Sequence, residues 1–262
     1  MNLNLTSKNA MVCGSSRGIG KAVAIELAKL GANIILVARD ESKLKEVVIQ
    51  LDISSGQKHT YLVVDFNHPE ELKSKVAGLL AAHHPIHILI NNTGGPAPGT
   101  ILVAAPEQLI SAFSNHILCN QILVQAIVPG MKEAGFGRIV NIISTSVKQP
   151  IPGLGVSNTI RGAVASWSKT LAGELGAFGI TVNNVLPGYT RTDRLNSLIE
   201  RKTKQSGKSI QEVEKDMIQD IPTNRFGQPE EIASAVAFLV SEAAGYVNGI
   251  NLPVDGGRLS CL

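Results

Sequence analysis

The residues Cys13-Gly14-Ser15-Ser16-Arg17-Gly18-Ile19-Gly20 decide the fold of this chain. They follow a short apolar run at residues 9–13, and from Ile19 to Leu30 apolar residues recur at helical spacing. Glycines in such a turn let the backbone approach a pyrophosphate, while free N–H groups and the positive end of the helix dipole bind its charge. The stretch therefore predicts a dinucleotide site formed by residues 14–20.

Short β-branched runs alternate with longer segments of helical period along the rest of the sequence. The runs fall at residues 9–13, 33–38, 60–64, 87–90, 138–143, 180–186 and 250–254. Most are continuously apolar, as buried parallel strands are. The alternation predicts an α/β fold, namely a single-domain Rossmann-type, doubly wound parallel sheet of about seven strands with helices on both faces. We expect this one domain to span residues 1–262.

Three further segments bear on assembly and on the site. Residues 106–133 and 153–176 are long and helical in pattern, with Ala and Leu on more than one face. We expect them to pack on the sheet and on a second subunit. Residues 191–224 are charged and amphipathic and lie between two strands that a short turn could join. We interpret them as a substrate flap over the site.

The composition narrows the class of protein. The chain has 262 residues, of which 44% are hydrophobic and 17% charged, so it buries a large core and is not disordered. Its net charge of +3 comes from mixed acidic and basic residues, which argues against a nucleic-acid partner. We expect no membrane span or signal peptide, because apolar runs end before about 18 residues and residues 1–8 lack a basic start.

Cysteine and histidine usage favours a cytoplasmic protein without a metal. Cys13, Cys119 and Cys261 are far apart and form no CxxC pair, which fits a reducing compartment. The stretch His83-His84-Pro85-Ile86-His87 is rich in metal-binding side chains. Pro85 breaks the helix that would align them, however, and no acidic or thiol side chain is close in sequence. We interpret the stretch as a solvated turn.

Several motifs placed after successive strands identify a family resemblance. They are the glycine turn at residues 13–20, Asp65-Phe66, Asn91-Asn92-Thr93-Gly94, Pro187-Gly188 and Pro253-Val254-Asp255-Gly256-Gly257. With them, nearly the whole chain resembles the short-chain dehydrogenase/reductase family, and its overall pattern is most similar to 3-oxoacyl-[acyl-carrier-protein] reductases. The resemblance implies a nicotinamide cofactor, a homotetramer or dimer, and a small-molecule or acyl-linked carbonyl substrate.

The same resemblance assigns the cofactor contacts beyond the glycine turn. It implies that Asp65, next to Phe66, holds the adenine amino group, and that Asn92 lies along the adenosine ribose. It also implies that backbone groups around Gly188 and Thr190 hold the nicotinamide carboxamide. We add Gly94 and Pro187, which belong to the same motifs, to the predicted cofactor site.

The end of the second predicted strand, Val37-Ala38-Arg39-Asp40, bears on the choice between NAD and NADP. An NAD site places a carboxylate here for the ribose 2′-OH, whereas NADP needs room and positive charge for a 2′-phosphate. Ala38 stands where NAD-preferring relatives carry the acid. Arg39 and Arg17 could both bind the 2′-phosphate, so NADP is predicted. The alternative is that both arginines are solvated and Asp40 reaches the ribose.

The catalytic residues of the resembled family are only partly present. Ser144 matches the serine that polarises the carbonyl oxygen, and the resemblance keeps that role for it. The YxxxK pattern, however, is Ser157-Asn158-Thr159-Ile160-Arg161, so Ser157 and Arg161 stand at the Tyr and Lys positions. Arg161 can still present a cation to the ribose, but Ser157 is a far weaker acid than Tyr.

Two other residues are candidates for the missing proton donor. His116 takes the Asn position of the family's proton relay, and Tyr189 directly follows Pro187-Gly188, beside the expected nicotinamide. The plainer interpretations are a histidine packed in a helix interface and an aromatic pocket wall.

These residues leave two functions open. The first is an NADP-dependent oxidoreductase that reduces a 3-oxoacyl-like or other small ketone with altered proton delivery. The second is an NADP-binding pseudoenzyme, a sensor or partner subunit, in which Ser157 and Arg161 mark lost chemistry.

Overall fold

Seven parallel strands form one sheet in the order β3-β2-β1-β4-β5-β6-β7. This computed structural model of the protein describes residues 1–82 and 85–261. The strands are β1 (Asn9–Cys13), β2 (Asn33–Ala38), β3 (Thr60–Val63), β4 (Ile88–Asn91), β5 (Gly137–Ile142), β6 (Ile180–Pro187) and β7 (Asn251–Val254). The strand order reverses between β1 and β4, and open α/β sheets bind ligands outside the carboxyl ends of the strands at such a switch point.

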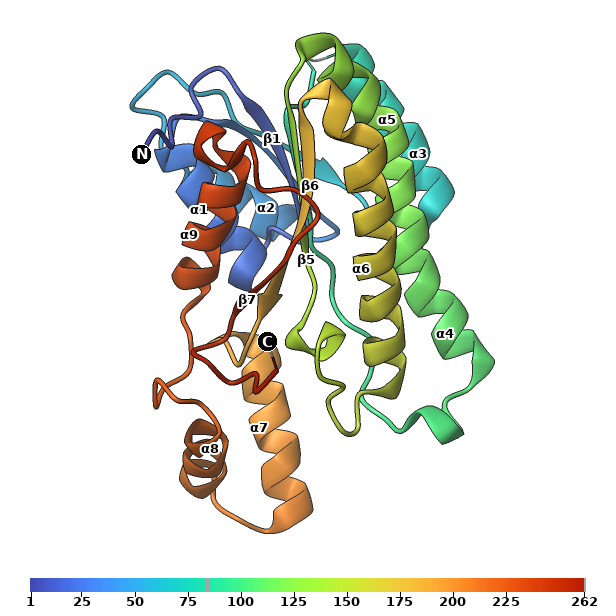
Figure 1. Cartoon of the computed structure of the whole chain (residues 1–262), viewed down its shortest axis with the longest axis vertical. Helices are drawn as coiled ribbons and strands as arrows, with labels where there is room; N and C mark the ends of the chain where they lie inside the picture. The colour runs from blue at the N-terminus through green and yellow to red at the C-terminus, as the bar shows by residue number, and fades with distance from the viewer. Residues whose placement is uncertain (83–84, 262) are drawn as a thin grey trace.

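Helices cover both faces of the sheet (Figure 1). One face carries α1 (Gly18–Lys29), α2 (Glu41–Val48) and α9 (Pro229–Val240), whereas the other carries α3 (Pro69–Ala82), α5 (Cys119–Ala134) and α6 (Gly155–Leu175). Strand β1 shows why its run is apolar throughout. Val12 packs into the first layer and Met11 into the second, because successive side chains of a strand point to opposite faces.

The predicted α/β fold class is confirmed by this sheet and its two helix layers. Each strand begins and ends within one residue of the predicted position. The agreement arises because a parallel strand buried on both faces must be apolar along its whole length, and this makes its limits visible in the sequence.

The prediction of one long helix over residues 106–133 is wrong in one detail. The segment consists of α4 (Pro106–Phe113), a π-helical turn η2 (Ser114–Leu118) and α5. A π turn adds one residue to the helical turn and so rotates the following side chains, and such turns are frequent at functional sites. His116 lies inside this turn and is buried.

Four asparagines form a ladder across the sheet, one on each of β4, β5, β6 and β7. The first three donate from Nδ2 to Oδ1 of the next, from Asn91 to Asn141 (2.9 Å), from Asn141 to Asn184 (2.8 Å) and from Asn184 to Asn251 (2.8 Å). The four are direct partners in the strand register. Oδ1 of Asn91, at the end of the ladder, is buried and has no hydrogen-bond partner among the described residues.

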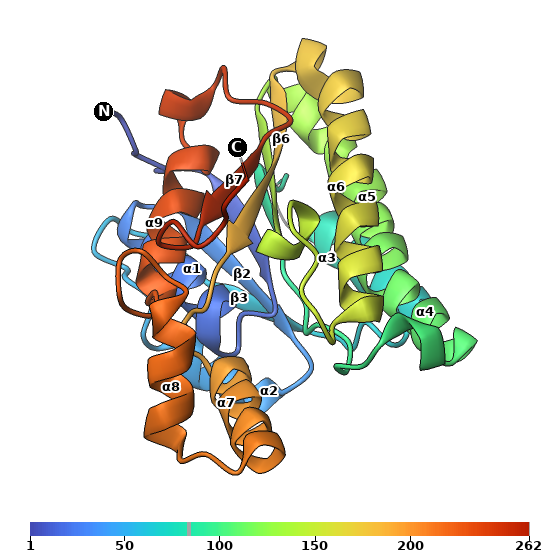
Figure 2. The same ribbon diagram turned by 60° about the horizontal axis from the view of Figure 1, so that its bottom comes forward.

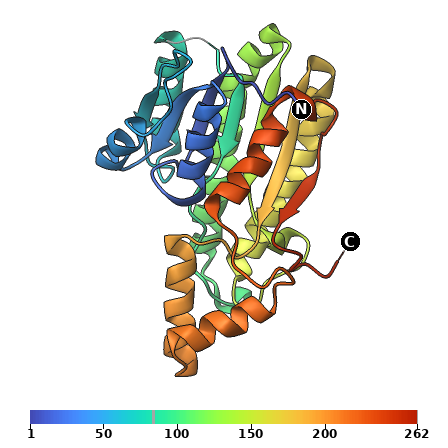
Figure 3. The ribbon, with the colours of Figure 1, turned by 90° about the vertical axis from the view of Figure 1, so that its left-hand side faces the viewer.

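Residues 191–224, the predicted flap, form a helix pair. The helices α7 (Asp193–Ser206) and α8 (Ile210–Gln219) pack around a small apolar cluster of their own, which includes Leu195, Ile199 and Met217. Figures 2 and 3 show the pair lying beyond the carboxyl ends of the strands, away from the two helix layers. The pair therefore stands at the edge of the sheet where the site is expected.

The outer surface around α4 carries apolar side chains. Leu102 and Val103 in the short helix η1 (Ile101–Val103), together with Ile110 and Phe113 in α4, are all at least half exposed. None of the described helices has the length and apolar character that crossing a membrane requires.

Candidate active site

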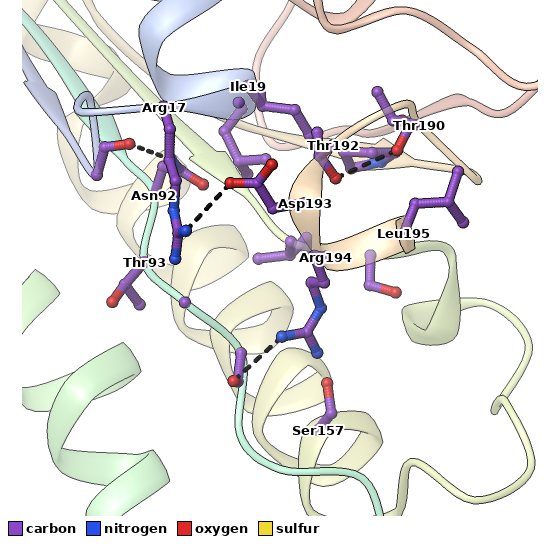
Figure 4. Close-up of a pocket in the computed structure, with 18 of the residues that line it drawn as sticks. Arg17, Ile19, Asn92, Thr93, Ser157, Thr190, Thr192, Asp193, Arg194 and Leu195 are labelled. Carbon is purple, nitrogen blue, oxygen red and sulfur yellow. Dashed lines mark hydrogen bonds and ion pairs between the residues drawn. The ribbon is translucent and has the colours of Figure 1, made fainter. Parts of the chain in front are cut away.

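A cleft of about 820 Å³ opens at the carboxyl ends of the strands. Its walls come from the turns after β1, β2, β3, β4, β5 and β6, from the start of α6 and from α7. Figure 4 shows part of these walls, with Arg17 and Asn92 on one side and Arg194 and Ser157 on the other. The cleft is therefore where most of the predicted site residues meet.

The glycine turn contributes Gly14, Ser16, Arg17, Gly18 and Ile19 to the cleft. Gly14 and Gly18 have left-handed φ angles of 60° and 55°, which side chains other than glycine disfavour. The turn is also tight, because a Cβ on Gly14 would lie 2.6 Å from the carbonyl oxygen of Asn92.

Two residues predicted to contact the cofactor, Ser15 and Gly20, do not line the cleft. Ser15 is fully buried, and its Oγ accepts a hydrogen bond from the Val37 backbone N–H (2.9 Å), which ties the turn to β2. A Cβ on Gly20 would lie 2.2 Å from the Gly14 carbonyl oxygen, so this glycine allows α1 to start close to the turn. Both residues therefore stabilise the conformation of the turn without facing the cleft.

The glycine turn and the end of β2 present positive charge to the cleft. Arg17 and Arg39 both line it, and their side chains are 64% and 70% exposed. Asp40 is absent from the lining, because its carboxylate accepts hydrogen bonds from Ser42 Oγ (2.7 Å) and the Lys43 backbone N–H (3.2 Å) and caps α2. The Ser42 hydrogen bond also lowers the pKa of Asp40. The alternative in which Asp40 reaches the ribose therefore finds no support here.

The remaining cofactor residues of the prediction all line the cleft. They are Asp65, Phe66, Asn92, Gly94, Pro187, Gly188 and Thr190. Asn92 Nδ2 donates to the carbonyl oxygens of Cys13 (3.3 Å) and Gly14 (3.4 Å), which holds the end of β4 against the glycine turn.

Ser144, Ser157 and Arg161 lie in the same cleft. Ser144 Oγ accepts a hydrogen bond from the Ser146 backbone N–H (3.1 Å), which leaves the hydroxyl proton available for donation. Arg161 donates from Nη1 to the Ile142 carbonyl oxygen (2.8 Å) and is buried. Burial, and then the charge of Arg194, lower the pKa of Arg161 to about 10.

His116 lies outside the cleft. It borders a separate small cavity of about 10 Å³ together with Asn91, Asn120, Asn141 and Arg161. Burial, followed by the positive charge of Arg161, lowers the pKa of His116 to about 2. The ring is therefore neutral near pH 7, and the structure separates this candidate proton donor from the cleft.

Tyr189 does line the cleft. Its hydroxyl accepts a hydrogen bond from Arg258 Nη2 (3.2 Å), and the Arg258 guanidinium also lies 4.3 Å from the centre of the ring. Because the phenol oxygen is an acceptor in this contact, its own proton remains free to be donated elsewhere.

Sequence reasoning missed three arginines that line the cleft, Arg194, Arg201 and Arg258. Arg194 donates from Nη1 to the Gly95 carbonyl oxygen (3.2 Å). The first two lie on α7, within the segment predicted to cover the site, so their type and position were a usable signal. Arg258 follows the Asp255-Gly256-Gly257 motif and gave no such signal in the sequence.

Among the described residues, no group of three or more His, Cys, Asp or Glu side chains could hold a metal ion. His87 Nδ1 accepts a hydrogen bond from the Asn9 backbone N–H (3.0 Å). His83 and His84 lie outside the described residues.

Comparisons with known proteins agree with this arrangement. A family model described as enoyl-(acyl carrier protein) reductase matches residues 14–258. The 3-oxoacyl-[acyl-carrier-protein] reductase FabG of Haemophilus influenzae is 32% identical over 253 residues, which cover 97% of this chain and 98% of that protein. The chain belongs to the short-chain dehydrogenase/reductase family, as the motif resemblance predicts.

Two further relatives bear on the cofactor. The NADPH-dependent reductase BacG of Bacillus subtilis is 29% identical over 272 residues, covering 98% of this chain and all of that protein. The crystal structure of L-sorbose reductase from Gluconobacter frateurii, complexed with NADPH and L-sorbose, superposes with a TM-score of 0.93 at 33% identity over the full length of both chains. The NADP prediction is confirmed by these relatives.

Proposed function

We propose that the protein is an NADP(H)-dependent oxidoreductase that reduces a 3-oxoacyl-like or other small ketone to an alcohol, with proton delivery that does not use a Tyr–Lys pair. One observation carries the proposal. A single cleft holds the glycine turn and Arg39 at one end and Ser144, Ser157 and Arg161 at the other. Cofactor-binding and catalytic side chains therefore face a common space.

The residues present fit NADP better than NAD. Arg17 and Arg39 stand at the cleft wall, Ala38 leaves room beside them, and Asp40 is engaged in capping α2. The two arginines would hold the 2′-phosphate, the glycine turn the pyrophosphate, and residues around Gly188 the carboxamide. When bound, the nicotinamide supplies the hydride.

The chain's own groups would act on the substrate oxygen. The Ser144 hydroxyl, whose oxygen already accepts a backbone N–H, would donate to the carbonyl and polarise it. Arg161 would hold the ribose through guanidinium nitrogens other than the Nη1 bound to Ile142. Tyr189 is our candidate for the proton donor, because it lies in the cleft with its proton free, whereas His116 is neutral and outside it.

NADPH oxidation over a panel of ketones, with Ser144→Ala as the matched control, tests the function. We expect turnover that Ser144→Ala abolishes and that Tyr189→Phe slows about 10²–10⁴-fold, the usual contribution of a general acid. A rate unchanged in Tyr189→Phe would assign protonation to Ser157 or to an acid carried by the substrate. Tight NADPH binding without turnover on any ketone would instead support the pseudoenzyme.

We also propose a homotetramer or dimer and a cytoplasmic location. The exposed apolar side chains of η1 and α4, Leu102, Val103, Ile110 and Phe113, support burial of this surface against another subunit. All three cysteines are free, in keeping with a reducing compartment. Light scattering at micromolar concentration tests the assembly, and a monomer would contradict it.

A further inference from the structure

The cleft is unusually rich in arginine. Of the nine arginines in the chain, six line it, whereas no lysine in the described part of the chain does. The six are Arg17, Arg39, Arg161, Arg194, Arg201 and Arg258. The only carboxylates among the described lining residues are Asp65 and Asp193.

Half of these arginines already have a role in the proposed function. Arg17 pairs with Asp193 (3.1 Å) and Arg39 with Asp65 (3.8 Å) beside the proposed 2′-phosphate position. Arg161 stands at the proposed ribose position. These three therefore leave Arg194, Arg201 and Arg258 without an assignment.

Among the described residues, the unassigned arginines have no ion-pair partner. Within residues 1–82 and 85–261, no Asp or Glu lies within salt-bridge distance of Arg194, Arg201 or Arg258, whereas Arg191 and Arg225 nearby each pair with a glutamate at 2.6 Å. Nε of Arg258 is buried and makes no hydrogen bond in this part of the chain. Guanidinium groups that line a cleft without a carboxylate partner keep their paired N–H donors available for an anion carried by a ligand.

The three also face one region of the cleft. Arg194 and Arg201 are seven residues apart on α7, about two helical turns, and so lie on the same face of the helix. Burial, and then the charge of Arg201, lower the pKa of Arg194. Arg258 is held beside Tyr189, which lines the same wall. Figure 4 shows the Arg194 guanidinium directed toward the part of the cleft that holds Ser157.

We propose that Arg194, Arg201 and Arg258 bind an oxyanion on the substrate, a carboxylate or a phosphate, so that the protein reduces an anionic carbonyl compound. The inference rests on the proposed function and narrows its substrate class. Arginine suits this role because its planar donors match the oxygens of either group in pairs. The anion would lie in the cleft beside α7, within reach of these three side chains.

Pairs of ligands that share the reacting carbonyl group, one anionic and one neutral, test the proposal without requiring turnover. Pyruvate, acetoacetate and levulinate, each compared with its methyl ester, are titrated calorimetrically into the protein saturated with NADP⁺. Acetoacetyl-CoA, compared with the uncharged N-acetylcysteamine thioester, provides the phosphate arm. The variants are Arg201→Gln and Arg258→Gln, and the control is Lys202→Gln, whose exposed side chain is on the same helix but outside the cleft.

We expect at least one charged ligand to bind about tenfold or more tightly than its neutral partner. Arg201→Gln and Arg258→Gln should remove that difference, while Lys202→Gln keeps it and NADP⁺ affinity stays within threefold throughout. A difference confined to the oxo acids identifies a carboxylate, and one confined to the thioesters identifies a phosphate.

Equal binding of every charged and neutral pair, or no binding of any, would overturn the inference. So would a tenfold loss of NADP⁺ affinity in Arg201→Gln, because the arginines would then serve the cofactor. Failure of the proposed function is a separate result, since it is the absence of NADPH oxidation with all substrates, whatever these titrations show.

Discussion

Arg194 on α7 donates a hydrogen bond to the carbonyl oxygen of Gly95, 99 residues earlier in the chain, at 3.2 Å. The contact joins the flap to the loop after β4 across the cleft (Figure 4). It is close, because a Cβ on Gly95 would lie 2.7 Å from Nη2 of Arg194. Any side chain at position 95 would therefore meet the Arg194 guanidinium.

Gly95→Ala should displace Arg194 without unfolding the protein. The added methyl meets only the end of a flexible side chain, so we expect the midpoint of thermal unfolding to change by less than about 2 °C, as for a near-neutral substitution. The KM for an anionic ketone should rise about tenfold, the effect of losing one charge-assisted contact.

Gly99→Ala is the matched control for this prediction, since an added Cβ there meets nothing within 4 Å. It should leave both the unfolding midpoint and KM unchanged. An unaltered KM in Gly95→Ala would show that Arg194 does not contact the substrate from this position.

Arg39→Asp should reverse or abolish the preference for NADPH. The pair with Asp65 is exposed and contributes little, so Arg39 is free to hold the 2′-phosphate at about 1.5–3 kcal/mol. Calorimetric titration should show NADPH affinity falling about tenfold or more, while NADH affinity is retained or rises. Lys45→Asp, an equal charge change on α2 outside the cleft, should alter neither affinity. Equal affinities of the unmodified protein for NADPH and NADH would contradict the assignment.

Ser157→Tyr combined with Arg161→Lys should raise the rate on ordinary neutral ketones. The pair would restore a general acid, whose contribution is about 10²–10⁴ in rate, because a nearby lysine can lower the pKa of a phenol. Steady-state NADPH oxidation by the double variant is compared with that of each single variant, neither of which should show the gain.

The Arg194 guanidinium is directed toward the part of the cleft that holds Ser157, so we expect it to compete with a phenol ring at position 157 for space. Adding Arg194→Ala to the double variant should therefore increase the rate further. No increase in either the double or the triple variant would show that the cleft does not place a phenol at position 157 productively.

His116 should make stability fall as the pH is lowered. Its pKa is about 2 in the folded protein and about 6.5 when unfolded, so below pH 6.5 the unfolded state binds a proton that the folded state refuses. At pH 5 this favours unfolding by about 2 kcal/mol, and the loss is absent above pH 7. His116→Asn should flatten the dependence between pH 7.5 and 5, measured by urea unfolding, whereas the exposed His68→Asn should not. If the free energy of unfolding of both variants depended on pH in the same way, His116 would not be the origin of the pH dependence.

The sheet and the cofactor end of the cleft were predictable, because each is specified locally. A strand buried on both faces must be apolar, so the composition of β1 predicts a buried strand. A turn that approaches phosphate must be rich in glycine, so the composition of residues 14–20 predicts a phosphate-binding turn. A buried His116 was one of the two interpretations that the sequence left open, but the π turn that contains it was not predictable, since the helical period does not reveal such a turn. The convergence of Arg194 and Arg258 is likewise a tertiary result, as the residues come from a flap helix and from the end of the chain.

The asparagine ladder favours the native register of strands β4 to β7 when the sheet forms. If β7 docked one residue out of step, Ile250 or Leu252 would face Asn184, and an interior amide would lose its partner at about 1–3 kcal/mol. The same free-energy cost applies to the Asn91–Asn141 and Asn141–Asn184 pairs. A shift in register between any two neighbouring strands from β4 to β7 therefore breaks a side-chain hydrogen bond. Hydrophobic side chains alone discriminate poorly between registers of strands with similar composition. The asparagine ladder disfavours the shifted registers. It therefore helps to set the positions of the strand ends that carry the cleft.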